Sequence, residues 1–281
     1  MKLGKFKIEF IDAGNFALDG GAMFGVIPKP LWEKTNPSDE ANRIKLAARL
    51  MLIEWDNEKL LIDTGMGDKW DEKSKKIYDI HTDISLEKEL AKKGLTTGQI
   101  TKVLLTHLHF DHAGGNTKNV KGKILPTFPN AQYYVRKQNF EWALSPSERD
   151  IRNYMHENFV PLAEEGVLTL LEDRDTELAE GIILHELNGH TFGHQCVQVT
   201  DGSQSLFYCA DLFPTYAHVP LPYIMGFDLQ PLITLQDKKK ILTKAIEEDW
   251  TLVLQHDPDI PAIKVEKTEK GFGVKEKIYS L

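Results

Sequence analysis

The chain has 281 residues, of which 41% are hydrophobic and 27% are charged, so it can bury a sizeable core and belongs to neither the disordered nor the fibrous class. Its 42 acidic and 34 basic residues give a formal net charge of −8, which repels the phosphate backbone of nucleic acids. Two cysteines, Cys196 and Cys209, exclude a disulfide scaffold, and no apolar run approaches the roughly 20 residues that cross a bilayer.

The N-terminal apolar run is interrupted by Glu9 and Asp12, whereas a signal peptide requires an uninterrupted one. We therefore expect a cytoplasmic protein that works without a membrane or nucleic-acid partner. The sequence leaves open whether the chain forms a homodimer.

The first half of the chain alternates between strand-like and helical patterns. Residues 5–14 alternate apolar and polar side chains and predict a strand, and residues 47–65 predict two strands joined by a tight turn. Residues 86–95 predict a helix, and the apolar run 102–106 predicts a buried strand. That strand leads directly into a histidine-rich loop.

The second half continues in the same style. Residues 131–135 and 182–186 predict strands, and residues 195–211 predict a hairpin that turns at an Asp-Gly pair. An amphipathic helix is predicted for residues 235–250, followed by a strand at residues 251–255.

Two segments do not fit this alternation. Residues 15–42 are rich in glycine and proline, and residues 136–165 have a helical pattern. We interpret both as insertions near a functional site. No linker-like composition divides the chain, so we expect a single α/β domain that spans residues 1–281.

The strongest chemical signal is the segment from Thr106 to Gly115, which holds three histidines and one aspartate within six positions. Neutral imidazole and carboxylate are ligands that zinc, iron and manganese favour, and a loop after a strand can turn successive side chains toward one point. Gly114 and Gly115 suit a tight turn after the cluster. A chance cluster of surface histidines is the less favoured interpretation, because the pattern is long and follows a predicted strand.

Further candidate ligands follow later predicted strands. Each metal ion needs three or four protein ligands, so a pair of ions must recruit residues from outside the first loop. The chain offers His190 in Asn-Gly-His-Thr, Asp211 in Tyr-Cys-Ala-Asp and His256 in Leu-Gln-His-Asp.

This arrangement resembles the metallo-β-lactamase superfamily, whose pattern is His-x-His-x-Asp-His, then Gly-His-Thr, then an aspartate and a histidine that each end a strand. Asp63-Thr64-Gly65 is similar to the turn that precedes the histidine motif in many members. Residues 19–28 and 211–215 look like those of the quorum-quenching N-acyl-homoserine lactonase group. The resemblance implies a four-layer αββα sandwich.

The resemblance also implies a set of seven metal ligands. It assigns His107, His109 and His190 to one metal ion, Asp111, His112 and His256 to a second, and Asp211 to both. A carboxylate has two oxygens and can span two ions, which agrees with Asp211 as the bridge. The implied cofactors are two divalent ions, zinc in the first place, with iron, manganese or cobalt as alternatives. A cysteine at the bridging position would have indicated a true β-lactamase.

Several neighbouring residues have a more ordinary interpretation. Seven ligands already satisfy two metal ions, so we expect His194 to support a ligand rather than bind metal. Asp63 and Asp257 are expected to orient ligating histidines, with a plain turn carboxylate as the alternative. Cys196 and Cys209 are expected in the core. Three histidines without a spacing signal, His81, His156 and His185, are expected at the surface or in packing contacts.

One position departs from the lactonase pattern. The best-known members carry a tyrosine three positions after the bridging aspartate, where it contacts the substrate carbonyl, and this chain has Pro214 there. Tyr216, Tyr223 or His218 could take that role, or could simply form the pocket wall.

The predicted activity is metal-dependent hydrolysis of a small-molecule ester, with a lactone of the N-acyl-homoserine type as the first choice. The nucleophile would be a hydroxide shared by the two metal ions, and Asp111 would protonate the leaving alkoxide. A phosphotriesterase or arylesterase on the same site is the closest alternative. A glyoxalase II type thioesterase, a redox iron protein and a non-catalytic metal binder are less favoured, because the chain lacks the extra domains of the first two and retains every ligand.

Overall fold

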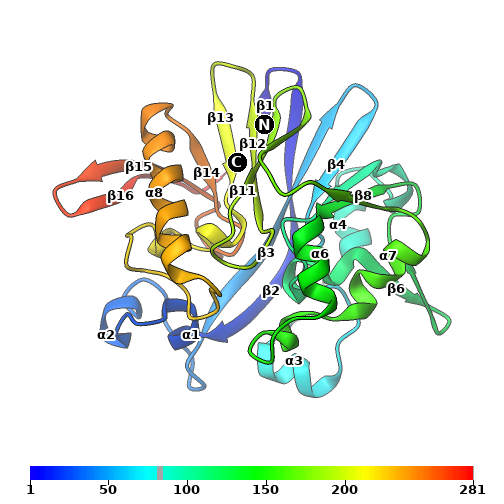
Figure 1. The fold of residues 1–281 in the computed structure, drawn as a ribbon, viewed down its shortest axis with the longest axis horizontal. Helices are drawn as coiled ribbons and strands as arrows, with labels where there is room; N and C mark the ends of the chain where they lie inside the picture. The colour runs from blue at the N-terminus through cyan, green and yellow to red at the C-terminus, as the bar shows by residue number, and fades with distance from the viewer. Residues whose placement is uncertain (81–84, 281) are drawn as a thin grey trace. The chain divides into compact units, whose positions relative to one another are not determined.

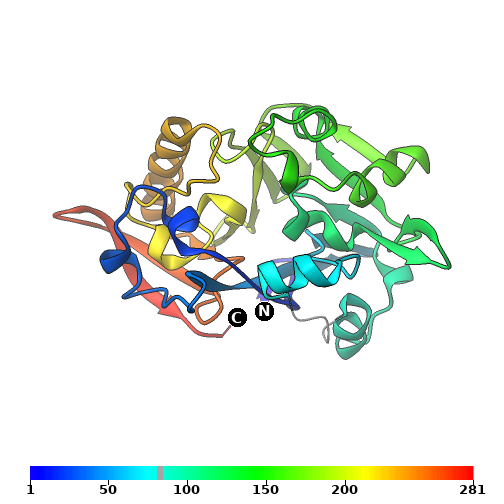
Figure 2. The same ribbon diagram turned by 90° about the horizontal axis from the view of Figure 1, so that it is seen from below.

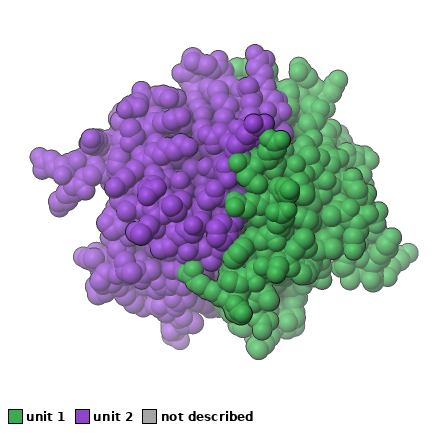
Figure 3. Space-filling view, in the orientation of Figure 1, with its two compact units in different colours: residues 1–14, 48–173 green, residues 15–47, 174–281 purple. Residues whose placement is uncertain are grey.

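The computed structural model describes residues 1–80 and 85–280. The chain divides into two compact units, and each unit combines an early segment with a later one (Figure 3). Unit 1 comprises residues 1–14 and 48–173, and unit 2 comprises residues 15–47 and 174–281. The assignment of the whole chain to a single domain stays a prediction.

The first sheet has seven strands among the described residues, in the order β1-β2-β3-β4-β5-β8-β9 (Figure 1). Its strands are β1 (Lys2–Leu3), β2 (Phe6–Asp19), β3 (Arg43–Trp55), β4 (Glu58–Ile62), β5 (Lys102–Leu104), β8 (Gln132–Arg136) and β9 (Leu168–Leu171). Strands β4, β5 and β8 pair in parallel, so their carboxyl ends meet at one edge of the sheet. Asp63 follows β4 and Thr106 follows β5, which explains why these two distant residues meet.

The second sheet lies in unit 2 and has the order β10-β11-β12-β13-β14-β15-β16 among the described residues. Its strands are β10 (Thr176–Ala179), β11 (Ile182–Glu186), β12 (Gln195–Thr200), β13 (Ser205–Tyr208), β14 (Thr251–Val253), β15 (Ala262–Thr268) and β16 (Gly271–Ile278). β12 is antiparallel to both β11 and β13, and β13 is parallel to β14. Strands β11, β13 and β14 therefore run in one direction and end at one edge, where His190, Asp211 and His256 follow.

Short helices connect the strands, and the longest helix, α8, packs against β15 (Figure 2). The α-helices are α1 (Gly20–Phe24), α2 (Lys29–Trp32), α3 (Glu72–Tyr78), α4 (Leu86–Lys92), α5 (Phe110–Ala113), α6 (Lys137–Leu144), α7 (Val160–Glu164) and α8 (Pro231–Glu247). The 3₁₀ turns are η1 (Thr97–Gln99), η2 (Gly114–Asn116), η3 (Ile151–Asn153), η4 (His156–Asn158), η5 (Ala210–Leu212) and η6 (Tyr216–His218). A separate two-stranded sheet contains β6 (Thr117–Val120) and β7 (Lys123–Pro126).

The core of unit 1 packs around the parallel strands of the first sheet. Leu61, Val103 and Tyr133, which lie on β4, β5 and β8, are completely buried and belong to one hydrophobic cluster. Parallel strands covered on both faces read as short continuous apolar runs, which is why residues 102–106 predicted a buried strand. No helix among the residues that the structure describes is long and apolar enough to traverse a bilayer.

The predicted strands and helices are present, with three informative differences. The helical pattern of residues 136–165 is divided into α6, η3, η4 and α7, because Ser145 precedes Pro146 and a residue before proline disfavours the helical region. The predicted hairpin turn is longer than a two-residue turn: Thr200 pairs with Ser205, so residues 201–204 form the loop. Within it the Asp201 carboxylate accepts hydrogen bonds from the amides of Ser203 and Gln204. The β15–β16 hairpin was not anticipated.

Candidate metal centre

The histidine-rich loop of unit 1 follows β5 at the carboxyl edge of the first sheet. His107 and His109 lie before α5, and Asp111 and His112 lie within it. All four side chains are buried, and the rings of His107 and His109 have centroids 4.4 Å apart. Asp111 Oδ2 is 3.5 Å from Nε2 of His112. The donor atoms of His107 and His109 lie within 4.8 Å of one another, as do those of Asp111 and His112.

Asp63 braces this loop. Its Oδ1 accepts a hydrogen bond from the Thr106 amide at 2.8 Å, and its Oδ2 accepts one from the Thr106 hydroxyl at 2.9 Å. The same Oδ2 is 2.9 Å from Nδ1 of His112, so Nδ1 carries the proton and Nε2 is left to act as a metal ligand. This contact supports the expected orienting role of Asp63.

Gly114 and Gly115 are required by close packing rather than by an unusual backbone angle. A Cβ on Gly114 would lie 2.1 Å from the Met66 carbonyl oxygen, and one on Gly115 would lie 2.3 Å from the carbonyl oxygen of Thr64. Lys69 secures the same turn, because its ammonium donates hydrogen bonds of 2.6 Å to the carbonyl oxygens of Gly114 and Thr117. The tight-turn explanation for the two glycines was therefore incomplete.

Two further residues of unit 1 support the loop and were not found from the sequence. The Oδ1 of the buried Asn139, on α6, accepts a hydrogen bond from the Leu108 amide at 2.9 Å, between the first two histidines. The ring of Tyr154 packs edge-on against His109 with centroids 4.8 Å apart. Both belong to the segment interpreted as an insertion near the site, and no spacing pattern identifies them.

In unit 2 the carboxylate of Asp211 lies between two histidines. Its Oδ2 is 3.0 Å from Nε2 of His190, and its Oδ1 is 3.0 Å from Nε2 of His256. One carboxylate thus presents a different oxygen to each imidazole, which is the arrangement that a bridging carboxylate requires. Ala210, just before it, has a φ of 43°, an uncommon conformation for alanine that turns the chain sharply after β13.

His190 is held by the segment that leads into α8. Nδ1 of His190 is 2.8 Å from Oδ1 of the buried Asp228, and the amides of Leu229 and Gln230 donate to the carbonyl oxygens of His190 and Gly189. Burial on its own would lower the pKa of His190, but the carboxylates of Asp211 and Asp228 raise it to about 9. The surroundings of this ring are therefore suited to positive charge. The sequence had not identified Asp228.

His256 is oriented by backbone atoms. Nδ1 of His256 donates to the Ala47 carbonyl oxygen at 2.7 Å, and its amide donates to the carbonyl oxygen of Pro214 at 3.1 Å. The carboxylate of Asp257 instead accepts hydrogen bonds from the amides of Tyr216 and Ile260. Asp257 therefore acts as a turn carboxylate in these contacts, because a backbone carbonyl already serves the ring that we expected it to orient.

The supporting residues of unit 2 behave largely as expected. His194 is buried, and its Nε2 accepts a long hydrogen bond of 3.4 Å from the Asp211 amide, so it helps to place the bridging residue. Cys196 and Cys209 are buried, as expected, and the Cys196 thiol donates to the Cys209 carbonyl oxygen. His185 packs against Phe207 and Trp250.

Of the other two histidines without a spacing signal, His156 is exposed and packs on Phe159, and His81 lies outside the described residues.

The segment after Asp211 contains the three residues considered for the missing tyrosine. Nε2 of His218 is 2.9 Å from the Met23 carbonyl oxygen, and its Nδ1 is 2.8 Å from the Thr215 hydroxyl. Both ring nitrogens are engaged, so His218 cannot also polarise a substrate carbonyl. The ring of Tyr216 has the ammonium of Lys277 3.6 Å from its centroid.

A buried lysine anchors the turn that carries Tyr223. The Lys238 ammonium, on α8, donates to the carbonyl oxygens of Pro220 at 2.9 Å and Tyr223 at 2.8 Å, with a longer contact to Leu221. Burial lowers the pKa of Lys238 to about 7, against an ordinary value of 10.5.

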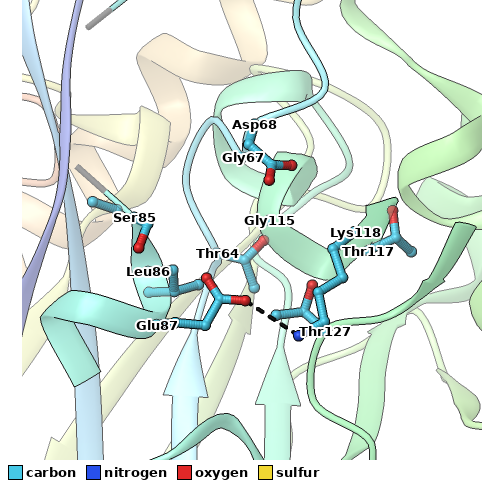
Figure 4. Close-up of a pocket in the computed structure, with 11 residues that line it drawn as sticks. Thr64, Gly67, Asp68, Ser85, Leu86, Glu87, Gly115, Thr117, Lys118 and Thr127 are labelled. Atoms are coloured by element: carbon cyan, nitrogen blue, oxygen red, sulfur yellow. Dashed lines mark hydrogen bonds and ion pairs between the residues drawn. The ribbon is translucent and has the colours of Figure 1, made fainter. Parts of the chain in front are cut away.

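A small polar cavity in unit 1 lies next to the turns that contain Thr64 and Gly115 (Figure 4). It has a volume of about 50 Å³ and is lined by Thr64 and Gly115 on one side and by the Glu87–Lys118 ion pair on another, with its charged atoms 3.2 Å apart. This is room for a few water molecules. The cavity is therefore too small to be a substrate site.

The donors in both units suit divalent transition metals. They are imidazoles and carboxylates without cysteine, in buried positions where a cation would offset the carboxylate charge. Most of the imidazoles have their second nitrogen fixed by a carboxylate, hydroxyl or carbonyl oxygen, as metal-ligating histidines generally do. Each of the two clusters therefore has the donor chemistry of a divalent metal site.

Comparison with known proteins places these features in a family. The model of the metallo-beta-lactamase superfamily matches residues 48–256. A probable metal-dependent hydrolase from Staphylococcus aureus has a solved structure that is 30% identical, with a TM-score of 0.90, and the match covers 100% of this chain and 99% of that one.

Two lactonases are also similar. The structure of AidC, a dizinc quorum-quenching lactonase with its product N-hexanoyl-L-homoserine, is 21% identical with a TM-score of 0.82, and the match covers 100% of this chain and 97% of that one. The N-acyl homoserine lactonase AiiA of Bacillus thuringiensis subsp. kurstaki is 24% identical over 268 residues, which are 89% of this chain and 93% of AiiA.

These matches confirm the fold class predicted from the sequence, α/β of the metallo-β-lactamase type. The family match spans all seven candidate ligands, from His107 to His256, and begins within β3. The chain therefore belongs to the metallo-β-lactamase superfamily, as a metal-dependent hydrolase.

Proposed function

We propose that the chain hydrolyses lactones of the N-acyl-homoserine type at a site with two divalent metal ions, most simply zinc. The ligands would be His107, His109 and His190 for one ion, Asp111, His112 and His256 for the other, and Asp211 for both. The observation that carries this proposal is the Asp211 carboxylate, whose two oxygens lie 3.0 Å from the Nε2 atoms of two different histidines.

Bound metal ions would supply Lewis acidity toward the substrate oxygen and would lower the pKa of water. The residues of the chain then have separate tasks. Asp63 and Asp228 keep Nδ1 of His112 and His190 protonated, so that Nε2 is the nitrogen of each ring that would bind metal. The Asp111 carboxylate would accept the proton that the attacking water releases and would pass it to the alkoxide oxygen that leaves when the lactone ring opens.

The choice of a lactone rests on the named relatives. AidC is described as a lactonase, and AiiA is described as an N-acyl homoserine lactonase. A ring ester needs an activated water, polarisation of its carbonyl and a stabilised leaving alkoxide, all of which a two-metal site can provide without a covalent intermediate.

One observation keeps a second activity in view. Pro214 replaces the tyrosine that contacts the carbonyl in well-known lactonases, and both nitrogens of His218 are occupied. This segment therefore offers less selection for a planar carbonyl over a tetrahedral phosphoryl group, which would suit a phosphotriester as well.

The test is a substrate panel on protein of measured metal content. Homoserine lactones with acyl chains of graded length, an aryl ester and an aryl phosphotriester are assayed in parallel, with Asp211→Ala as the inactive reference and His185→Phe as the matched control. We expect lactones to give the highest kcat/KM. Efficient turnover of the phosphotriester with no lactone activity would replace the lactonase proposal by the second activity.

A further inference from the structure

His218 joins two parts of unit 2 that are far apart in sequence. A carbonyl oxygen can only accept, so the 2.9 Å contact with Met23 is donated by Nε2–H of His218, and Nδ1 then accepts from the Thr215 hydroxyl at 2.8 Å. The ring is 1% exposed and both of its nitrogens are satisfied. Its side chain therefore ties α1 to the segment that follows Asp211.

Aromatic packing reinforces this connection. The ring of Phe24 stacks on His218 with centroids 4.6 Å apart and an interplanar angle of 9°. The ring of Trp32 also stacks on Phe24, with centroids 5.3 Å apart. All three rings are buried. α1 has only five residues, so its position depends on such tertiary contacts rather than on its own helical stability.

The backbones of the two parts also touch. The Gly226 amide donates to the Ala22 carbonyl oxygen at 2.8 Å, and Gly25 approaches the Ile224 carbonyl so closely that a Cβ would lie 2.5 Å from its oxygen. Asp228, two residues after Gly226, is hydrogen-bonded to His190. At the other end Thr215 follows Pro214, whose carbonyl accepts the His256 amide. The segment that His218 holds, from Pro214 to Asp228, thus begins at a residue that contacts His256 and ends at one that contacts His190.

We propose that His218 is a positioning residue, which fixes α1 against the segment from Pro214 to Asp228 and so determines how tightly substrate is held, without taking part in the chemical step. This rests on the proposed function, since the segment follows the candidate bridging residue. Neither ring nitrogen is available to a substrate atom, which separates this role from that of a catalytic residue.

Two variants and one control test the proposal. His218→Phe keeps a stacked ring and removes both hydrogen bonds, while Thr215→Val keeps the bond to Met23 and removes only the other. His185→Phe is the matched control, because His185 is also buried, hydrogen-bonded to Gln198 and packed on aromatic rings elsewhere in unit 2. For each protein, KM and kcat are measured with short-chain and long-chain homoserine lactones, together with metal content and amide hydrogen exchange.

For His218→Phe we expect KM to rise about tenfold with kcat within about twofold, the division expected when binding rather than the chemical step is lost. The Ile27 amide, which donates to the Phe24 carbonyl oxygen, and the Gly226 amide should exchange at least about tenfold faster, with metal content unchanged. Thr215→Val should show a smaller change of the same kind, and His185→Phe should show neither change.

Three results would overturn the proposal: a fall in kcat at constant KM, unchanged exchange at both amides, or equal effects in the control. If the unaltered protein opens no lactone, the proposed function fails, and the exchange measurement together with KM for whichever ester is hydrolysed still tests the role of His218.

Discussion

Asp228 offers the sharpest test of how this chain orients a candidate metal ligand, His190. It is 2% exposed, and its Oδ1 lies 2.8 Å from Nδ1 of His190, which is 4% exposed. Asp228→Asn can keep an oxygen acceptor for the ring N–H but removes the negative charge. Asp228→Ala removes both. Loss of such a partner typically lowers metal affinity 10- to 100-fold, so we expect about tenfold for Asn and about a hundredfold for Ala.

These factors correspond to about 1.4 and 2.8 kcal/mol of metal-binding free energy. The assay is competition with a chromogenic chelator, which needs no substrate and is therefore independent of the proposed activity. Asp150→Asn is the control, because Asp150 is also buried and hydrogen-bonded, to Trp142 and Ser147, without touching a candidate ligand. Metal affinity within about twofold of the unaltered protein for Asp228→Ala would refute the reasoning.

Three further predictions address the bridge, the loop and the buried lysine. Asp211→Ala should lose at least one of two metal equivalents in elemental analysis, and His190→Ala should lose more metal than His194→Ala; a single equivalent in the fully loaded protein would refute the dinuclear assignment. Gly114→Ala should lower the free energy of unfolding by about 1–3 kcal/mol or more in denaturant titrations, because the new Cβ meets backbone atoms of Met66, whereas Gly98→Ala makes only ordinary contacts and should be tolerated. The unfolded chain keeps the Lys238 proton up to about pH 10.5 and the folded chain releases it near pH 7, so stability should rise between these values by at most about 1.4 kcal/mol per pH unit relative to Lys238→Met. Parallel pH profiles for the two proteins would contradict that pKa.

The sequence alone determined the family, the seven candidate ligands and most of the strands. These depend on local signals: His107, His109, Asp111 and His112 are neighbours in the chain, and the buried parallel strands are short apolar runs. The later candidates His190, Asp211 and His256 each follow a predicted strand. The role of Asp63 was also predictable, because its turn is part of the recognisable pattern.

Only the tertiary structure identified the residues that orient those ligands. Asp228, Asn139 and the Ala47 carbonyl act on rings or amides that lie 31 to 209 positions away along the chain. Which residues form such hydrogen bonds depends on which strand ends and helix starts come together in space. The periodicity and spacing of residues in the sequence do not show this. For the same reason the sequence left His218 as a candidate for contacting the substrate carbonyl. The structure shows instead that Met23 and Thr215 engage both of its nitrogens.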